Sequence, residues 1–282
     1  MTVTEPRVQD SVGAALYFAR SNWQSIAGLS VAGALANTLI QMLGSLAPGM
    51  PLVTVFFVLA LYALVYATFI GLALRGGRPQ VDWKATLRLL GAMSVVGFFL
   101  LIVGFVLFMV GGVIVLGGPY ASFVQEMSRA SGDQNAVNAL ALRMFASNPW
   151  PVIGLAAVYF AVWLYLTTRL YLAAPASVDR GRILTFETWA WTKKTALKVA
   201  GARAMLIGPA FVLSFALTYL LGRAAGIDLF NAQTAAPQPV GALVFALGSG
   251  FISYCISDAL GAGLSTALYR DLGGQSASLP PR

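Results

Sequence analysis

The chain has 282 residues, of which 58% are hydrophobic and 10% are charged, and its formal net charge is +8. A typical soluble domain carries roughly 25% charged residues, so this composition excludes an ordinary soluble protein and predicts an integral membrane protein. The chain has no histidine and one cysteine, Cys255. These counts exclude Ser-His-Asp catalysis, His-ligated metals and an intramolecular disulfide. We therefore expect no enzymatic activity, no metal site and no cofactor.

Long charge-free stretches predict six membrane spans, because about 20 apolar residues cross a bilayer. The stretch between Arg20 and Arg75 is long enough for two spans, and four later stretches hold one each. The predicted fold is all-α: a polytopic bundle of six transmembrane helices with amphipathic helices on the cytoplasmic face. We expect one domain, residues 1–272, and a disordered tail, 273–282. The spans are placed at about 24–46, 51–74, 91–117, 151–174, 201–222 and 240–268.

Residues 9–20 predict a short amphipathic helix on the membrane surface. Val12, Leu16 and Ala19 share one face of it, with Ala15 beside them. The span that follows carries Gly28, Ala32 and Ala36 at intervals of four, and such small residues let another helix approach closely.

Asn37 lies in the same span, one turn before Gln41. Two interpretations stay open for this polar pair: hydrogen bonding between helices, or a polar patch on a substrate path.

The second connection predicts a surface helix over 81–90, with Asp82 as its N-cap. The third span follows and ends with Gly111-Gly112, which predicts a kink or close packing. The longest polar stretch, 119–149, predicts an extramembrane cap with a surface helix in it. Val137, Leu140 and Met144 define one face of that helix.

The segment Trp163–Arg203 holds seven of the eighteen Lys and Arg residues. It predicts a break at Pro175 and then a basic helix over 184–198. That helix offers five candidate contacts to lipid headgroups: Lys193, Lys194, Lys198, Trp189 and Trp191. Near anionic lipid each lysine contributes about 1 kcal/mol of attraction. The alternatives are a membrane-surface helix without specificity and specific recognition of a lipid or a protein.

Asp258 is the one acidic residue well inside a hydrophobic segment, and intramembrane charges usually face the bundle interior with a partner. Arg169 is the expected partner. The pair is either a buried ion pair that fixes helix register, or part of a cytoplasmic-side cavity that binds an ion, a proton or a lipid headgroup. The candidate polar site comprises Asp258, Arg169, Tyr254, Ser257 and Asn37.

The distribution of positive charge predicts the orientation. Three arginines, Arg129, Arg143 and Arg223, fall in the connections after spans one, three and five. The remaining Lys and Arg residues fall near the termini and in the connections after spans two and four. The positive-inside rule therefore places both termini in the cytoplasm. We expect a multi-pass protein of the bacterial inner membrane, with anionic lipids as partners on the cytoplasmic face and no nucleic acid.

Three segments carry a resemblance to known proteins: Arg169–Ser177, Thr188–Lys198 and Ala267–Leu272. In these segments the chain resembles a diffuse group of bacterial six-helix inner-membrane proteins, which includes the membrane domain fused to some glycerophosphodiester phosphodiesterases. In the fused members the chemistry belongs to a separate soluble domain, which has no counterpart in this sequence. The resemblance therefore implies a membrane component and carries over no catalytic residue.

Two functions follow from these features. The first is a non-enzymatic membrane protein that serves envelope or lipid-related integrity or acts as an assembly partner. The alternative is a transporter or channel subunit with a polar cavity around Asp258.

Overall fold

The computed structural model describes residues 8–46, 51–129, 134–227, 229 and 239–276, and these form helices and turns without a strand. The all-α prediction is confirmed. Six helical segments are long and apolar enough to cross a membrane: Trp23–Ser45, Leu52–Arg75, Trp83–Gly117, Trp150–Asp179, Ala196–Ala224 and Pro239–Leu272. The chain divides into two compact units, Met1–Ser94 with Thr168–Arg282 (unit 1) and Val95–Thr167 (unit 2).

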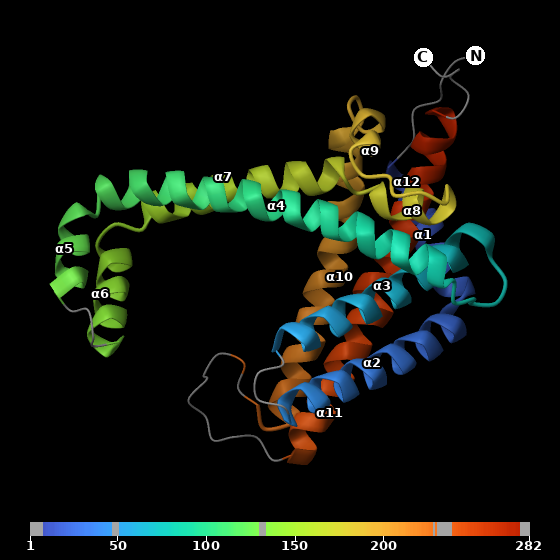
Figure 1. The fold of residues 1–282 in the computed structure, drawn as a ribbon, viewed down its shortest axis with the longest axis horizontal. Coiled ribbons are helices and arrows are strands. Elements are labelled where there is room, and N and C mark those ends of the chain that lie inside the picture. Colours follow the sequence, from blue (N-terminus) through green and yellow to red (C-terminus); the bar gives the residue numbers. More distant parts are fainter. Residues whose placement is uncertain (1–7, 47–50, 130–133, 228, 230–238, 277–282) are drawn as a thin grey trace. The chain divides into compact units, whose positions relative to one another are not determined.

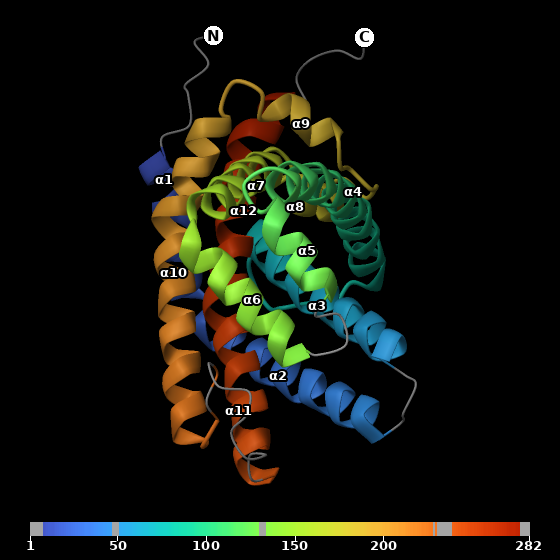
Figure 2. The ribbon, with the colours of Figure 1, turned by 90° about the vertical axis from the view of Figure 1, so that its left-hand side faces the viewer.

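Unit 1 is a helical bundle. In it α2 (Trp23–Leu46) packs on α3 (Pro51–Arg75) and on α11 (Pro239–Ile252). Helix α11 continues through a π-helical segment, η1 (Ser253–Asp258), into α12 (Ala259–Ser276), and α10 (Ala196–Ala224) runs beside all three (Figures 1 and 2). Because η1 and α12 also contact α3, residues far apart in sequence meet in the interior of this unit.

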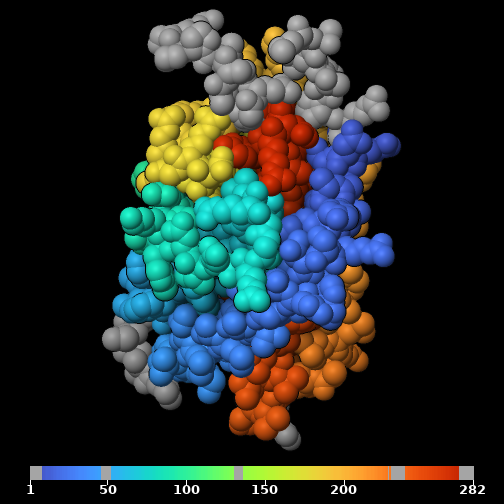
Figure 3. All heavy atoms as spheres, turned by 90° about the vertical axis from the view of Figure 1, so that its right-hand side faces the viewer, coloured from blue at the N-terminus to red at the C-terminus, as the bar shows by residue number. Residues whose placement is uncertain are grey.

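The N-terminal helix α1 (Val8–Ser21) packs along α12, as the blue and red surfaces of Figure 3 show. Its buried residues are Ser11, Val12, Ala15 and Phe18. The predicted face was therefore wrong in part, since Leu16 is half exposed. The buried face of α1 includes Phe18 because Gly263 of α12 leaves room for that ring. A β-carbon built on Gly263 would lie 2.9 Å from Phe18.

The residues of α2 that make close helix contacts also differ from the predicted stripe of Gly28, Ala32 and Ala36. Nothing lies within 4 Å of a β-carbon built on Gly28, so that residue accommodates no neighbour. The close approach is instead at Gly33, next to Val65 and Tyr254, and at Ala34, next to Gly250. The interior face of α2 is thus offset from the stripe that the sequence spacing favoured.

Three helix boundaries differ from the predictions. Helix α7 (Trp150–Arg169) ends at Arg169, and α8 (Ala173–Asp179) contains Pro175 in its first turn, where proline is tolerated. The expected break at Pro175 was therefore wrong. No separate surface helix covers 81–90, because α4 (Trp83–Gly117) is continuous. The predicted tail begins inside α12, which reaches Ser276, and residues 277–282 lie outside the described residues.

The predicted helix over 184–198 was also wrong, because that segment holds the short α9 (Glu187–Trp191), a turn and the start of α10. Threonine hydroxyls explain the interruption, since they compete for backbone carbonyls. The Thr192 hydroxyl donates to the carbonyl of Arg169 at 3.1 Å, which ties the turn to the end of α7.

Unit 2 consists of the remainder of α4, α5 (Ala121–Arg129), α6 (Gln134–Ser147) and most of α7. Figures 1 and 2 show α4 and α7 side by side and α5 beside α6. The close-packing interpretation of Gly111 is confirmed: a β-carbon there would collide with Leu155 of α7. The predicted helix in 119–149 is confirmed as well, with Val137, Leu140 and Met144 on its less exposed face.

Candidate functional site

A cavity of about 380 Å³ opens in unit 1 and is lined by residues of five helical segments. Its polar lining residues are Asn37 of α2, Tyr62 of α3, and Ser253, Tyr254 and Asp258 of η1. Its apolar lining residues are Val58, Leu59, Met93 and Gly250. We call it the Asp258 cavity. The sequence grouped Asn37, Tyr254 and Asp258 as one polar site, and the cavity brings these three together.

The Asp258 carboxylate has one occupied and one unoccupied oxygen. The Tyr62 hydroxyl donates to Oδ1 at 3.3 Å, while Oδ2 is buried and has no hydrogen-bond partner among the described residues. The Oδ1 of Asn37 is likewise buried and unpartnered. Buried polar atoms are nearly always paired in proteins, so two unpaired acceptors that line one cavity point to a ligand.

The backbone around Asp258 is specialised as well. Segment η1 is π-helical over six residues, and short π-helical segments occur often at functional sites. Tyr254 is buried in this segment and packs against α2 at Gly33. The π-helix therefore presents Tyr254 and Asp258 to the cavity from a distorted part of an otherwise continuous membrane helix.

A polar chain continues from the cavity into the bundle. Tyr66 stacks on Tyr62 with ring centroids 5.7 Å apart, and its hydroxyl lies near Gly261. Tyr171 donates to the carbonyl of Gly261 at 3.1 Å, and the Arg203 guanidinium lies 4.8 Å from the Tyr171 ring centroid. A row of three tyrosines and one arginine thus leads from Asp258 into the bundle: Tyr62, Tyr66, Tyr171 and Arg203.

The predicted ion pair between Arg169 and Asp258 was wrong, since Asp258 forms no ion pair with the described residues. Its carboxylate meets Tyr62 instead. The Arg169 side chain is buried and lies over the ring of Trp189, 4.9 Å from its centroid. The reason is the chain path: α7 ends at Arg169, beside α9, whereas Asp258 faces α2 and α3.

Ser257 points to a different neighbour from Asp258. Its hydroxyl lies 3.0 Å from the hydroxyl of Ser214 on α10. Ser257 thus links η1 to α10 and does not line the cavity, whereas Ser253 does line it.

The candidate lipid contacts fall into two groups. Lys193 and Lys194 are exposed in the turn after α9, and Lys198 lies partly buried in the first turn of α10. The two tryptophans are engaged inside unit 1: Trp189 by Arg169, and Trp191 by Arg180, whose guanidinium lies 4.6 Å from its ring centroid. The prediction that these five residues share one helix was therefore wrong, because the segment is interrupted between α9 and α10.

A second polar cluster was missed by the sequence reasoning. The Tyr269 hydroxyl donates to Asp179 at 2.7 Å and accepts from Arg180 at 3.1 Å. It connects α12 to the end of α8. Tyr269 lies in the segment Ala267–Leu272, which carries part of the resemblance and could have drawn attention to it. The residue after Tyr269, Arg270, donates to the carbonyls of Ala73 and Leu74 at the end of α3.

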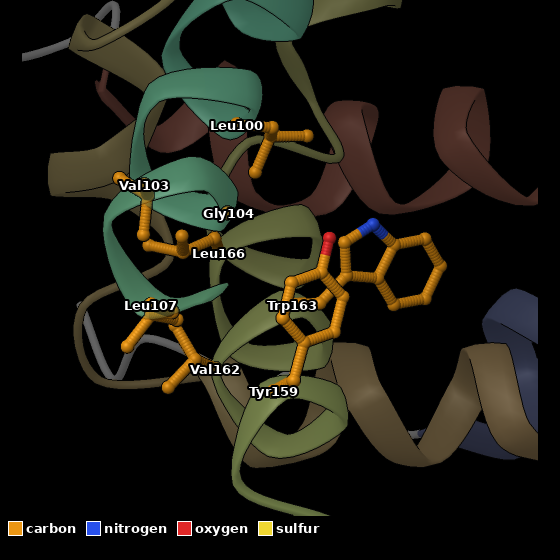
Figure 4. Close-up of a pocket in the computed structure, with 8 residues that line it drawn as sticks. All are labelled: Leu100, Val103, Gly104, Leu107, Tyr159, Val162, Trp163 and Leu166. Carbon is orange, nitrogen blue, oxygen red and sulfur yellow. The ribbon is translucent and has the colours of Figure 1, made fainter. Parts of the chain in front are cut away.

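Two other hollows lie within unit 2. The one in Figure 4, between α4 and α7 and beside Tyr159 and Trp163, holds about 10 Å³, no more than one water molecule. The other has about 560 Å³ and lies where α4 meets α5, with Gln125 as its one polar lining residue. Neither presents an ionisable carboxylate, so the Asp258 cavity is the candidate site with distinctive chemistry.

Comparison with protein-family models, with curated proteins and with solved structures finds no match. The site must therefore be interpreted from its own geometry.

Proposed function

We propose that this multi-pass membrane protein is a non-enzymatic transporter or channel subunit whose solute site is the Asp258 cavity. One observation carries the proposal: the cavity holds two buried, unpartnered acceptors, Asp258 Oδ2 and Asn37 Oδ1, on different helices. A charge inside a membrane segment is costly and marks solute and ion pathways. A purely structural aspartate would be expected to have both oxygens paired.

Uptake into proteoliposomes tests this function. The probes are radiolabelled methylammonium, lactate and glycine, which are a cation, an anion and a zwitterion. The wild type should take up at least one of them faster than protein-free vesicles do, and Asp258→Asn should abolish that flux. The matched control is Glu126→Gln, which neutralises an exposed carboxylate of unit 2. Flux of Asp258→Asn equal to wild type, at equal folded yield, would count against the proposal.

A structural or assembly role in the envelope is the second candidate. It is favoured by the extent to which arginines are used for internal contacts, as with Arg180 on Trp191 and Arg203 on Tyr171. It also agrees with the resemblance to bacterial six-helix membrane proteins. In that case none of the three probes is taken up, and Asp258→Asn either is tolerated or lowers protein abundance.

We further propose that the protein lies in the bacterial inner membrane with both termini in the cytoplasm. The excess of Lys and Arg near the termini and in the connections after spans two and four supports this orientation. Reporter fusions after positions 78, 183 and 280 should report a cytoplasmic location, and fusions after 133 and 232 an extracytoplasmic one. An extracytoplasmic signal at 78 or 183 would reverse the orientation.

Anionic lipids are the proposed partners on the cytoplasmic face. The exposed Lys193 and Lys194 support this, since each lysine near such a surface contributes about 1 kcal/mol. The double variant Lys193→Gln/Lys194→Gln should retain less co-purifying phosphatidylglycerol than the wild type, as measured by mass spectrometry. Equal retention would contradict this partner.

A further inference from the structure

We propose that the Asp258 cavity selects a small organic monocation: one ammonium group on a compact apolar body. This inference rests on the proposed function, because it names the class of solute that the same cavity takes. Four properties of the lining support it: its charge, its free acceptors, its rings and its volume.

The charge of the lining excludes anions. Among the described residues that line the cavity, Asp258 is ionisable as a carboxylate and none is Lys or Arg. The nearest arginine in the polar chain, Arg203, is engaged with the Tyr171 ring and donates to the Thr168 hydroxyl at 3.0 Å. An anion would therefore meet a carboxylate without a cation to compensate for it.

The free acceptors match an ammonium group. Tyr62 occupies one carboxylate oxygen of Asp258, which leaves Oδ2, and Asn37 offers Oδ1 from the neighbouring helix α2. A primary ammonium has several N–H donors and no acceptor. It has enough donors for both oxygens, whereas a neutral alcohol has one donor and would leave one oxygen unpaired.

The remaining lining distinguishes an organic cation from a metal ion. Hard divalent cations take six or more oxygen ligands, and in the described part of the chain no group of three or more acidic or cysteine side chains could hold one. The lining instead supplies Val58, Leu59 and Met93 as apolar walls. Two tyrosine rings, Tyr62 and Tyr254, add faces that attract a cation.

The volume sets the size of the ligand. At about 380 Å³ the cavity lies near the lower end of small-molecule sites, which span about 300–1,000 Å³. A ligand with one ring or a short alkyl chain fits this volume.

Binding of three aromatic probes of similar size to the purified protein in nanodiscs tests the inference. The probes are benzylammonium, benzyl alcohol and benzoate, each at the same ionic strength and measured by calorimetry. We expect benzylammonium to bind about tenfold or more tightly than the alcohol, because hydrogen bonds to charged groups are the stronger ones, and we expect no binding of benzoate. Asp258→Asn should remove the preference for the ammonium, and Glu126→Gln should keep it.

A second variant keeps the test decisive if Asp258→Asn folds poorly. Asn37→Leu removes the other free acceptor without changing charge, and it should weaken benzylammonium more than benzyl alcohol. Equal or tighter binding of benzoate or the alcohol, or no binding of any probe to the wild type, would overturn the inference.

The outcomes also separate this inference from the proposed function. Uptake of lactate or glycine that depends on Asp258, without binding of benzylammonium, would leave the transport function standing and overturn the choice of an organic cation. Tight binding of benzylammonium without flux of any solute would support the cation site and contradict transport.

Discussion

The two units bury different kinds of side chain, although both contain helices apolar enough to cross a membrane. Among the described residues, every buried serine, threonine or charged side chain lies in unit 1, including Ser30, Thr38, Thr68 and Arg169. In unit 2 the buried side chains are those of Tyr120 and Leu166. The most apolar stretch of α4 contains no buried residue.

This difference has a physical reason. Lipid is as apolar as leucine, so an apolar side chain gains little by moving from lipid into a bundle, and membrane helices associate through small and polar residues. High hydrophobicity therefore predicts that a helix spans the membrane. The small and polar residues indicate which spans pack closely together, as α2, α3, α11 and α12 do.

The largest expected difference between the units comes from adding bulk to a glycine. In Gly263→Val the β-carbon would meet the Phe18 side chain at 2.9 Å and the Ala15 backbone at 3.4 Å, so the Phe18 ring or α1 itself must shift. We expect about 1–3 kcal/mol of destabilisation, seen as a lower melting temperature by intrinsic tryptophan fluorescence. The matched control is Gly97→Val in unit 2, where nothing lies within 4 Å. Equal loss in both variants would contradict the difference in packing.

Removing one hydroxyl tests the polar contacts of unit 1. Tyr269→Phe deletes the group that donates to Asp179 and accepts from Arg180. The expected cost is about 1–2 kcal/mol, since two charge-assisted hydrogen bonds are lost. The measurement is the melting temperature of Tyr269→Phe. The control is Tyr159→Phe in unit 2, where the tyrosine side chain lies beside Gly104. The comparison fails if the control is destabilised as much.

A comparable polar contact in the described part of unit 2 joins the two ends of the α5–α6 segment. The buried Tyr120 hydroxyl donates to the carbonyl of Asn148, and so joins the start of α5 to the end of α6. Tyr120→Phe should cost about 1 kcal/mol and should act locally. Limited proteolysis should cut within 119–149 faster in this variant, while the melting of unit 1 stays unchanged. Unchanged cleavage would show that the contact does not hold the cap.

The smallest expected effect is at the N-cap of α4. Asp82 Oδ1 accepts from the N–H groups of Lys84 and Ala85 at 2.9 and 3.1 Å, and Asp82→Ala should cost about 0.5–1 kcal/mol. The N–H of Ala85, then that of Lys84, lowers the pKa of Asp82 below its ordinary value of 3.8.

The lowered pKa of Asp82 fixes the sign of a pH effect. The stabilisation is present above the ordinary pKa and is lost as the pH falls through the lowered folded value. The wild type should therefore lose its advantage over Asp82→Ala in melting experiments below about pH 4. A constant difference in melting temperature down to the lowest pH would contradict this cap.

The predicted contacts that were wrong have the same physical origin as the difference between the two units, namely packing between helices. The face of α1 and the close-contact residues of α2 were misplaced because sequence spacing defines a helix face but not which neighbour that face meets. Gly33 packs against Tyr254, more than two hundred residues away in sequence, and Gly28 packs against nothing. Arg169 was assigned to Asp258 by its charge and its expected depth in the membrane, whereas the end of α7 directs it to Trp189.

The candidate site was predictable in part. An acidic residue within a charge-free stretch is visible in the sequence, so Asp258 could be singled out, and Asn37 and Tyr254 with it. Tyr62 could not be distinguished from the other tyrosines of an apolar span, because its role depends on the packing of α3 against η1. The π-helical geometry of Ser253–Asp258 likewise has no signature in the residues themselves.

By itself, the sequence determined the number of apolar helices and their approximate ends, because crossing a bilayer requires long uninterrupted apolar stretches. It also determined that a lone carboxylate lies within the last of them. The tertiary structure alone decided which helices surround that carboxylate, which of its oxygens is left unpaired, and that aromatic rings rather than an arginine are its neighbours. These depend on how distant helices pack, and helix packing in a membrane is set by small and polar contacts that hydrophobicity does not specify.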